Sequence, residues 1–199
     1  MTADVDAAVT TGQQDTASVP LFAWDSASYI FPDSATHVFE YSDGGHTPAD
    51  AGKPPMRELY PFVHDITVFG GTRAYHSQFT DFEEGNSVWG VPGRCRAWVE
   101  ARLARGWRAV PYCDRYDLAR LRFELGPVLW SSPFVEFWIP TLDHNIKPQG
   151  WTQETLAADI ARHWHVTIPA HRLWGNQEAG ETSGSGGNWD RTKVWNSWN

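Results

Sequence analysis

Short apolar runs that end in polar or acidic residues recur along the chain and predict β-strands. The predicted strands are 19–25, 36–41, 65–69, 77–82, 109–113, 135–142, 171–174 and 192–195. Apolar residues at helical spacing predict helices over 92–105, 117–125 and 152–163, and a short irregular helix within 48–60. Strands that alternate with helices are typical of parallel sheets. Eight strands in 199 residues predict an α/β fold, a small TIM-like (β/α)8 barrel with short or missing outer helices.

The first 18 residues differ from the rest, because they lack apolar periodicity and are rich in Thr, Ala, Asp and Gln. This composition predicts a flexible N-terminal arm over 1–18 and one barrel domain over 19–199. The arm has no basic stretch followed by an apolar one, so we expect no signal peptide. No apolar run reaches the ~20 residues of a membrane-spanning helix, so we expect no transmembrane segment.

Two acids close the predicted strand 77–82. Side chains alternate between the faces of a strand, so Asp81 and Glu83 are expected to point the same way, while Phe82 points toward the helix layer. Neighbouring carboxylates cannot both ionise freely, so the pKa of one should rise. One acid could then donate a proton while the other stays charged. The alternative interpretation is a pair of solvated acids at a strand end.

Polar and acidic residues also follow the other predicted strands. The full set is Asp25, Tyr41, Asp43, Asp81, Glu83, Asp143, Asn176, Gln177 and Asp190. In a parallel barrel the C-terminal ends of the strands meet at one face, where active sites lie. This recurrence favours a functional site over isolated solvated ends.

Composition narrows the range of partners. A net charge of −8 and a pI near 5.4 argue against binding to nucleic acid or to an anionic membrane. Twelve tryptophans indicate either core filling or stacking on sugar rings. Cys95 and Cys113 are expected to pack in the core, with a single bridge between them as the alternative. Histidines are scattered and only His163-x-His165 approaches metal-ligand spacing, so no metal site is predicted.

Several short motifs occur in a characteristic order. They are Trp24-Asp25, Tyr41-x-Asp43-Gly44, Asp81-Phe82-Glu83-x-Gly85-Asn86, Val110-x-Tyr112-Cys113, Trp138-Ile139-x-Thr141, Trp174-x-Asn176-Gln177 and Asn188-Trp189-Asp190. In order and spacing they resemble the glycoside hydrolase family 25-like barrels of actinobacteria and their phages, a group that includes lysozyme-type muramidases. The resemblance covers roughly residues 19–195.

The resemblance implies a peptidoglycan-directed hydrolase that needs no metal or organic cofactor. Glu83 would be the general acid, and Asp81 would stabilise positive charge or the acetamido group of the substrate. The implied substrate-binding residues are Asp25, Tyr41, Asp43, Asp143, Trp174, Gln177 and Asp190. The implied location is a phage virion, or host cytoplasm before release, with action at the cell wall.

A second function stays open at this point. Relatives of this kind can also serve as catalytically inactive virion (tail) or wall-binding modules, because a fold does not establish an activity. The short predicted loops and the arm over 1–18, which could dock onto other virion proteins, favour this alternative.

Overall fold

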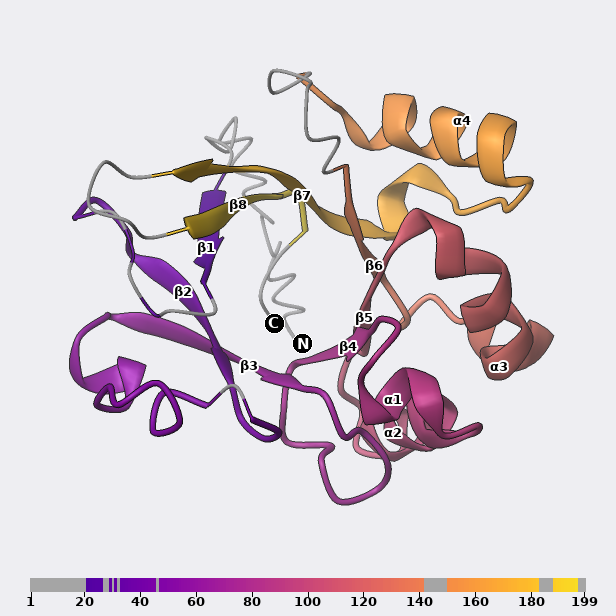
Figure 1. The fold of residues 1–199 in the computed structure, drawn as a ribbon. Coiled ribbons are helices and arrows are strands. Elements are labelled where there is room, and N and C mark those ends of the chain that lie inside the picture. The colour runs from indigo at the N-terminus through magenta and orange to yellow at the C-terminus, as the bar shows by residue number, and fades with distance from the viewer. Residues whose placement is uncertain are drawn as a thin grey trace, which may run out of the picture.

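The computed structural model is a closed barrel of eight strands in the order β1 to β8 (Figure 1). It describes residues 21–26, 29, 31, 33–45, 47–141, 150–182 and 188–196, so the N-terminal arm, Asp143 and the glycine-rich segment 183–187 lie outside the described residues. The strands are β1 (Leu21–Asp25), β2 (His37–Tyr41), β3 (Phe62–Thr67), β4 (Phe79–Phe82), β5 (Val110–Cys113), β6 (Phe137–Pro140), β7 (Leu173–Thr182) and β8 (Asn188–Val194).

The sheet is mixed. Neighbouring strands from β1 to β7 pair in parallel, whereas β8 is antiparallel to both β7 and β1. The prediction of an entirely parallel barrel is therefore wrong at its last strand. The physical reason is that β7 is much longer than predicted, and β8 pairs with it as the returning arm of an antiparallel ribbon. Figure 1 shows β8 lying between β7 and β1.

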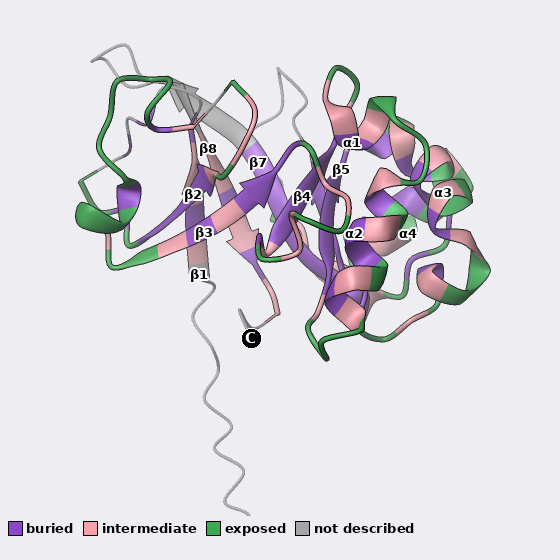
Figure 2. Cartoon of the chain, turned by 90° about the horizontal axis from the view of Figure 1, so that it is seen from below, coloured by how far each residue is buried: buried purple, intermediate pink, exposed green. Residues whose placement is uncertain are grey.

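The helices cover only part of the barrel. They are α1 (Ser87–Gly90), α2 (Arg94–Leu103), α3 (Leu118–Trp130) and α4 (Gln153–Trp164), with 3₁₀ turns η1 (Met56–Glu58), η2 (Arg115–Asp117) and η3 (Ala170–Arg172). Figure 2 shows the α-helices gathered on one side of the strands. Within the described ranges, the 3₁₀ turn η1 is the only helical element between β1 and β4. No helix of the described part of the chain has both the length and the apolar character needed to cross a membrane.

Two helices differ from the sequence prediction, one in its length and one in its existence, and each difference has a local cause. The α3 segment runs past the predicted end at residue 125, but it kinks at Gly126, whose φ of 69° is left-handed. Pro127 then begins the next turn, since a proline is tolerated where a helix starts. The short helix α1 was not predicted; the side chain of Asn86 caps it by accepting a hydrogen bond from the Trp89 backbone N–H.

The core has an outer and an inner part. The outer part lies between strands and helices and includes Phe82, Cys95 and Cys113, each 0% exposed. Both cysteines are free, which confirms the packing interpretation over the disulfide. Of the apolar helical positions that the spacing predicts to face inward, Leu103 is only partly buried. The others are buried: Cys95, Trp98, Val99, Leu118, Leu121, Leu125, Leu156 and Ile160.

An aromatic plug fills the barrel interior. It consists of Phe39, Phe79, Trp138 and Trp174, each no more than 2% exposed. The rings of Phe39 and Trp138 stack with centroids 4.4 Å apart, and Phe79 meets Trp174 edge-on at 4.6 Å. Such edge-on and stacked contacts are the favourable arrangements of aromatic pairs. The plug divides the two ends of the barrel from each other.

A buried histidine pair lies below the plug, near the N-terminal ends of β2 and β3. His37 Nδ1 and His64 Nε2 are 3.0 Å apart, and His64 Nδ1 lies 2.8 Å from the side-chain oxygen of Gln78. Burial lowers the pKa of His64 to about 4, so this ring is neutral near pH 7. These contacts give His37 and His64 a packing role in the barrel interior.

Arg102 of α2 corrects the expectation that the arginines of this helix, Arg94, Arg96, Arg102 and Arg105, lie in solvent. Its side chain is buried, and its guanidinium donates hydrogen bonds to the backbone carbonyls of Tyr75, Ser77 and Arg108. These carbonyls belong to the segments that lead into β4 and β5. A buried carbonyl without a donor is costly, so the arginine fixes both segments.

Phe82 tests the placement of β4. Because this side chain is completely buried in the outer core, Phe82→Ala is expected to lower the free energy of unfolding by about 3–5 kcal/mol. Urea denaturation of both proteins measures the change. The matched control is Phe123→Ala on α3, where the ring is 89% exposed, and its midpoint should stay near wild type. Equal midpoints for all three proteins would contradict the described packing.

Candidate active site

A pocket of about 200 Å³ opens at the end of the barrel where the parallel strands terminate. Residues from every strand or its immediate continuation line it: Asp25, Tyr41, Ile66, Asp81, Glu83, Tyr112, Trp138, Gln177 and Asp190. The structure thus brings together most of the side chains predicted from the sequence. The predicted residues found in this pocket are Asp25, Tyr41, Asp81, Glu83, Gln177 and Asp190.

Strand β4 places the acid pair by alternation. Phe79 belongs to the aromatic plug, so Asp81, two residues later, also faces the barrel interior. Asp81 is only 8% exposed, which does not fit a solvated strand end. Glu83 follows the strand and is partly buried. Gly85, with a left-handed φ of 104°, then turns the chain into α1.

The antiparallel strand β8 brings a further acid to the same end. Asp190 lies directly opposite Asp25 in the β1–β8 pairing. The hydroxyl of Tyr41 donates to Oδ2 of Asp25 at 3.4 Å, and the side-chain amide of Gln177 donates to Oδ2 of Asp190 at 2.9 Å. Each acid therefore has one oxygen held by a neighbouring strand, which fixes its orientation.

The pocket raises the pKa of each of its carboxyl groups. Burial, followed by the charge of Asp190, raises the pKa of Asp25 to about 7. Burial, then the charges of Glu83 and Asp25, raise the pKa of Asp81 well above its ordinary value. Burial and the charge of Asp114 raise the pKa of Glu83, while burial raises that of Asp190. With a pKa of about 7, Asp25 in particular is partly protonated near neutral pH.

Several buried polar atoms of the pocket have no hydrogen-bond partner among the described residues. They are Oδ1 of Asp25, Oδ1 of Asp81, Oε1 of Gln177 and Nε1 of Trp138. Folded proteins seldom bury unpaired polar groups, because each costs about 1–3 kcal/mol. Their concentration around one pocket indicates a site built for a polar ligand that offers both donors and acceptors.

Tyr112 and Trp138 line the pocket but were not predicted as site residues. Both lie in strands and face inward, since they pack in the interior cluster with Phe79. Their rings meet edge-on with centroids 4.8 Å apart. The sequence signal that could have identified them is the alternation of side chains along β5 and β6, because it points Tyr112 and Trp138 into the barrel.

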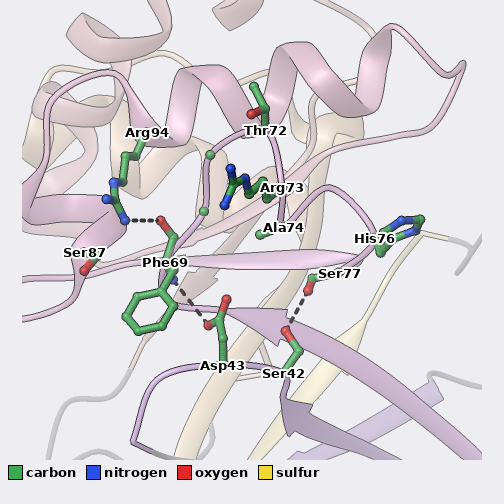
Figure 3. Close-up of a pocket in the computed structure, with 12 residues that line it drawn as sticks. Ser42, Asp43, Phe69, Thr72, Arg73, Ala74, His76, Ser77, Ser87 and Arg94 are labelled. Atoms are coloured by element: carbon green, nitrogen blue, oxygen red, sulfur yellow. Dashed lines mark hydrogen bonds between the residues drawn. The ribbon is translucent and has the colours of Figure 1, made fainter.

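Asp43 lies outside this pocket. Its carboxylate accepts hydrogen bonds from the Thr67 hydroxyl and from the backbone N–H groups of Val68 and Phe69, and thereby shapes the loop after β3. It lines a separate pocket of about 900 Å³, into which Figure 3 shows Arg73 and Arg94 projecting. None of the unpaired buried side-chain atoms of the described residues belongs to this larger pocket.

Trp174 also lies apart, since it belongs to the plug and lines a pocket at the N-terminal end of the strands. Asp143 lies in a stretch that the structure does not describe.

Comparisons of this chain with protein-family models, curated proteins and solved structures found no match. Within the described ranges, no three His, Cys, Asp or Glu residues are grouped in a way that could hold a metal ion.

Asp25 provides a test of the pocket's electrostatics. Its pKa is about 7 in the folded protein and about 3.8 in an unfolded chain, so the folded state binds more protons between these values. Wild-type stability must then fall as the pH rises from about 4 to about 7. Asn cannot ionise, so Asp25→Asn should match wild type near pH 4 and exceed it at pH 8 by roughly 2–4 kcal/mol.

Denaturation at the two pH values measures this difference. The control is Asp33→Asn, which removes an exposed carboxylate and should change stability little at either pH. A stability difference for Asp25→Asn that is the same at pH 4 and pH 8 would contradict the raised pKa.

Proposed function

We propose that this protein is a glycoside hydrolase of the muramidase type that acts on cell-wall peptidoglycan, on a reduced TIM-like (β/α)8 barrel related to glycoside hydrolase family 25. The observation that carries the proposal is the Asp81-x-Glu83 pair inside a buried pocket that raises the pKa of both acids. Two neighbouring carboxyl groups, one kept protonated by a raised pKa and the other ionised during the reaction, are the usual means of glycosidic bond cleavage.

Glu83 is assigned as the general acid. It is more exposed than Asp81, so it can reach the oxygen between two sugar units. As the bond from the anomeric carbon to that oxygen breaks, the oxygen keeps the bonding electrons and takes the proton of Glu83. A water molecule then adds to the anomeric carbon and returns a proton to Glu83, which restores the acid.

Asp81 is assigned to the positive charge that develops during bond cleavage. It lies deeper in the pocket, on the floor formed by the barrel interior. A carboxylate there can stabilise the oxocarbenium-like sugar or orient its acetamido group. Burial disfavours the ionised form of Asp81, and the positive charge that develops on the sugar would stabilise that form.

The remaining lining residues fit substrate binding. Asp25 and Gln177 line the pocket, and their carboxyl and amide groups are of the kinds that hydrogen-bond to sugar hydroxyl groups. The pocket is smaller than the roughly 300–1,000 Å³ of typical small-molecule sites, so it suits one sugar unit of a polymer. An inactive virion or wall-binding module has no need of an open acidic pocket, which favours the enzyme.

Glu83→Gln tests the proposal. The amide preserves the shape of the side chain but cannot donate a proton in the same way, so cleavage of purified actinobacterial peptidoglycan should fall by roughly 100-fold or more. Asp81→Asn should reduce turnover to a similar extent, because a neutral amide cannot stabilise the developing cation. Release of reducing sugar ends measures turnover, and circular dichroism verifies folding.

The neighbouring Glu84→Gln is the matched control, since Glu84 is exposed and does not line the pocket. It should keep wild-type activity. Equal activity of wild type and Glu83→Gln at matched folding would remove Glu83 from the mechanism. Folded wild-type protein without any activity on the wall would favour the inactive module.

A further inference from the structure

A second pocket, of about 440 Å³, lies at the opposite end of the barrel from the acids. Its lining comes from the segments that precede β4, β5 and β6 and from the start of β7. Phe79 and Trp174 of the aromatic plug form its inner wall. Their ring centroids lie 5.7 Å and 5.8 Å from that of Trp138, which lines the acidic pocket on the other side. The two pockets therefore share one aromatic partition.

Exposed aromatic rings stand at the mouth of this second pocket. Trp107 is 41% exposed and Phe134 is 55% exposed. Large apolar side chains are costly to leave in water, so their position at a pocket mouth indicates a contact surface.

Trp107 is held in place from below. The Arg102 guanidinium lies 5.5 Å from its ring centre and 5.4 Å from that of Trp98, within the range of cation–π contacts. Arg102 is itself fixed by the three backbone carbonyls described above. The Trp107 platform is thus preorganised, which lowers the entropy that binding a ligand would cost.

A charged pair stands beside these rings. Arg108 donates to Oε1 of Glu136 at 2.9 Å, and Glu136 is only 5% exposed. Oε2 of Glu136 is buried and has no hydrogen-bond partner among the described residues. Burial raises the pKa of Glu136, and the charge of Arg108 opposes that rise. A donor-rich guanidinium and an acceptor therefore lie next to an aromatic wall.

We propose that this second pocket binds a sugar unit, at a site separate from the acidic pocket. Aromatic rings such as Trp107 and Phe134 match the apolar faces of sugar rings, while the Arg108 guanidinium, 40% exposed and oriented by Glu136, can donate to neighbouring hydroxyl groups. The volume lies within the roughly 300–1,000 Å³ range of small-molecule sites. The site would retain the protein on a glycan, and it does not depend on hydrolysis in the acidic pocket.

The experiment titrates the Glu83→Gln protein with the tetramer of N-acetylglucosamine and follows the tryptophan indole N–H signals by NMR. The Glu83 change prevents cleavage of the probe. The signal of Trp107, assigned by its loss in a Trp107→Ala variant, should shift and saturate. Loss of the exposed Phe134 ring in Phe134→Ala should weaken the binding reported by the Trp107 signal by about tenfold or more. Phe123→Ala removes a ring that is 89% exposed on α3 and should bind as the parent does.

The outcomes separate the two sites. A Trp107 signal that shifts while wild type fails to cleave peptidoglycan would support the second site and refute the proposed activity. Saturable shifts confined to Trp138 would place the probe in the acidic pocket alone and overturn the second site. A Trp107 signal that ignores the sugar but shifts with a short arginine-containing peptide would assign the pocket to a peptide and also overturn the proposal.

Discussion

The repulsion and burial of four carboxyl groups at one end of the barrel is the constraint on which the rest of the structure depends. Asp25, Asp81, Glu83 and Asp190 share a pocket of about 200 Å³, and burial raises the pKa of each. One pKa unit corresponds to about 1.4 kcal/mol, so the charged pocket works against folding. The closed sheet and the packed plug beneath it supply the stability that tolerates this arrangement. Such a locally unfavourable cluster is typical of functional sites.

The topology and the chemistry depend on each other. In a parallel barrel all strands deliver their C-terminal residues to one face, but β8 delivers its N-terminal half because it runs antiparallel. Asp190 therefore faces Asp25 from a neighbouring strand. The aromatic plug closes the barrel below these acids and forms the wall of a second pocket at the other end. One packed layer thus supports two separate polar environments.

The sequence predicted the features that periodicity controls. The apolar stripes identified the three long helices, and alternation placed Asp81 inward and Phe82 outward, as the structure has them. It could not predict the direction of β8. The polar residues Asn176 and Gln177 resemble a loop, so the predicted strand ended before them, whereas β7 continues through them and forms the ribbon with which β8 pairs. These residues are buried and tolerated inside a strand because each has a polar partner on an adjacent segment: Asn176 accepts from the Thr141 hydroxyl, and Gln177 donates to Asp190.

Other residues were misplaced because their partners are distant in sequence. Arg102 lies off the apolar stripe of its helix and was expected in solvent. It is buried instead, and its guanidinium donates hydrogen bonds to backbone carbonyls of two remote segments. Asp43 resembled the other acids at strand ends, yet its carboxylate accepts hydrogen bonds from the Thr67 hydroxyl and the Val68 N–H, in the loop after β3. Trp138 was not predicted as a site residue because the search followed polar side chains at strand ends. Its inward position in β6 nevertheless places it beside the acids. Long-range contacts of this kind follow from barrel closure, which no local pattern encodes.

The proposed chemistry requires that this pocket keep at least one carboxyl group protonated near neutral pH. Carbon-13 NMR titration of the side-chain carboxyl carbons of aspartate and glutamate, assigned by single Asn and Gln variants, measures this directly. Asp25 is expected to titrate near pH 7, and Asp81 and Glu83 above their ordinary values. Carboxyl groups of all four residues that titrate near pH 4, as in an unfolded chain, would contradict the account.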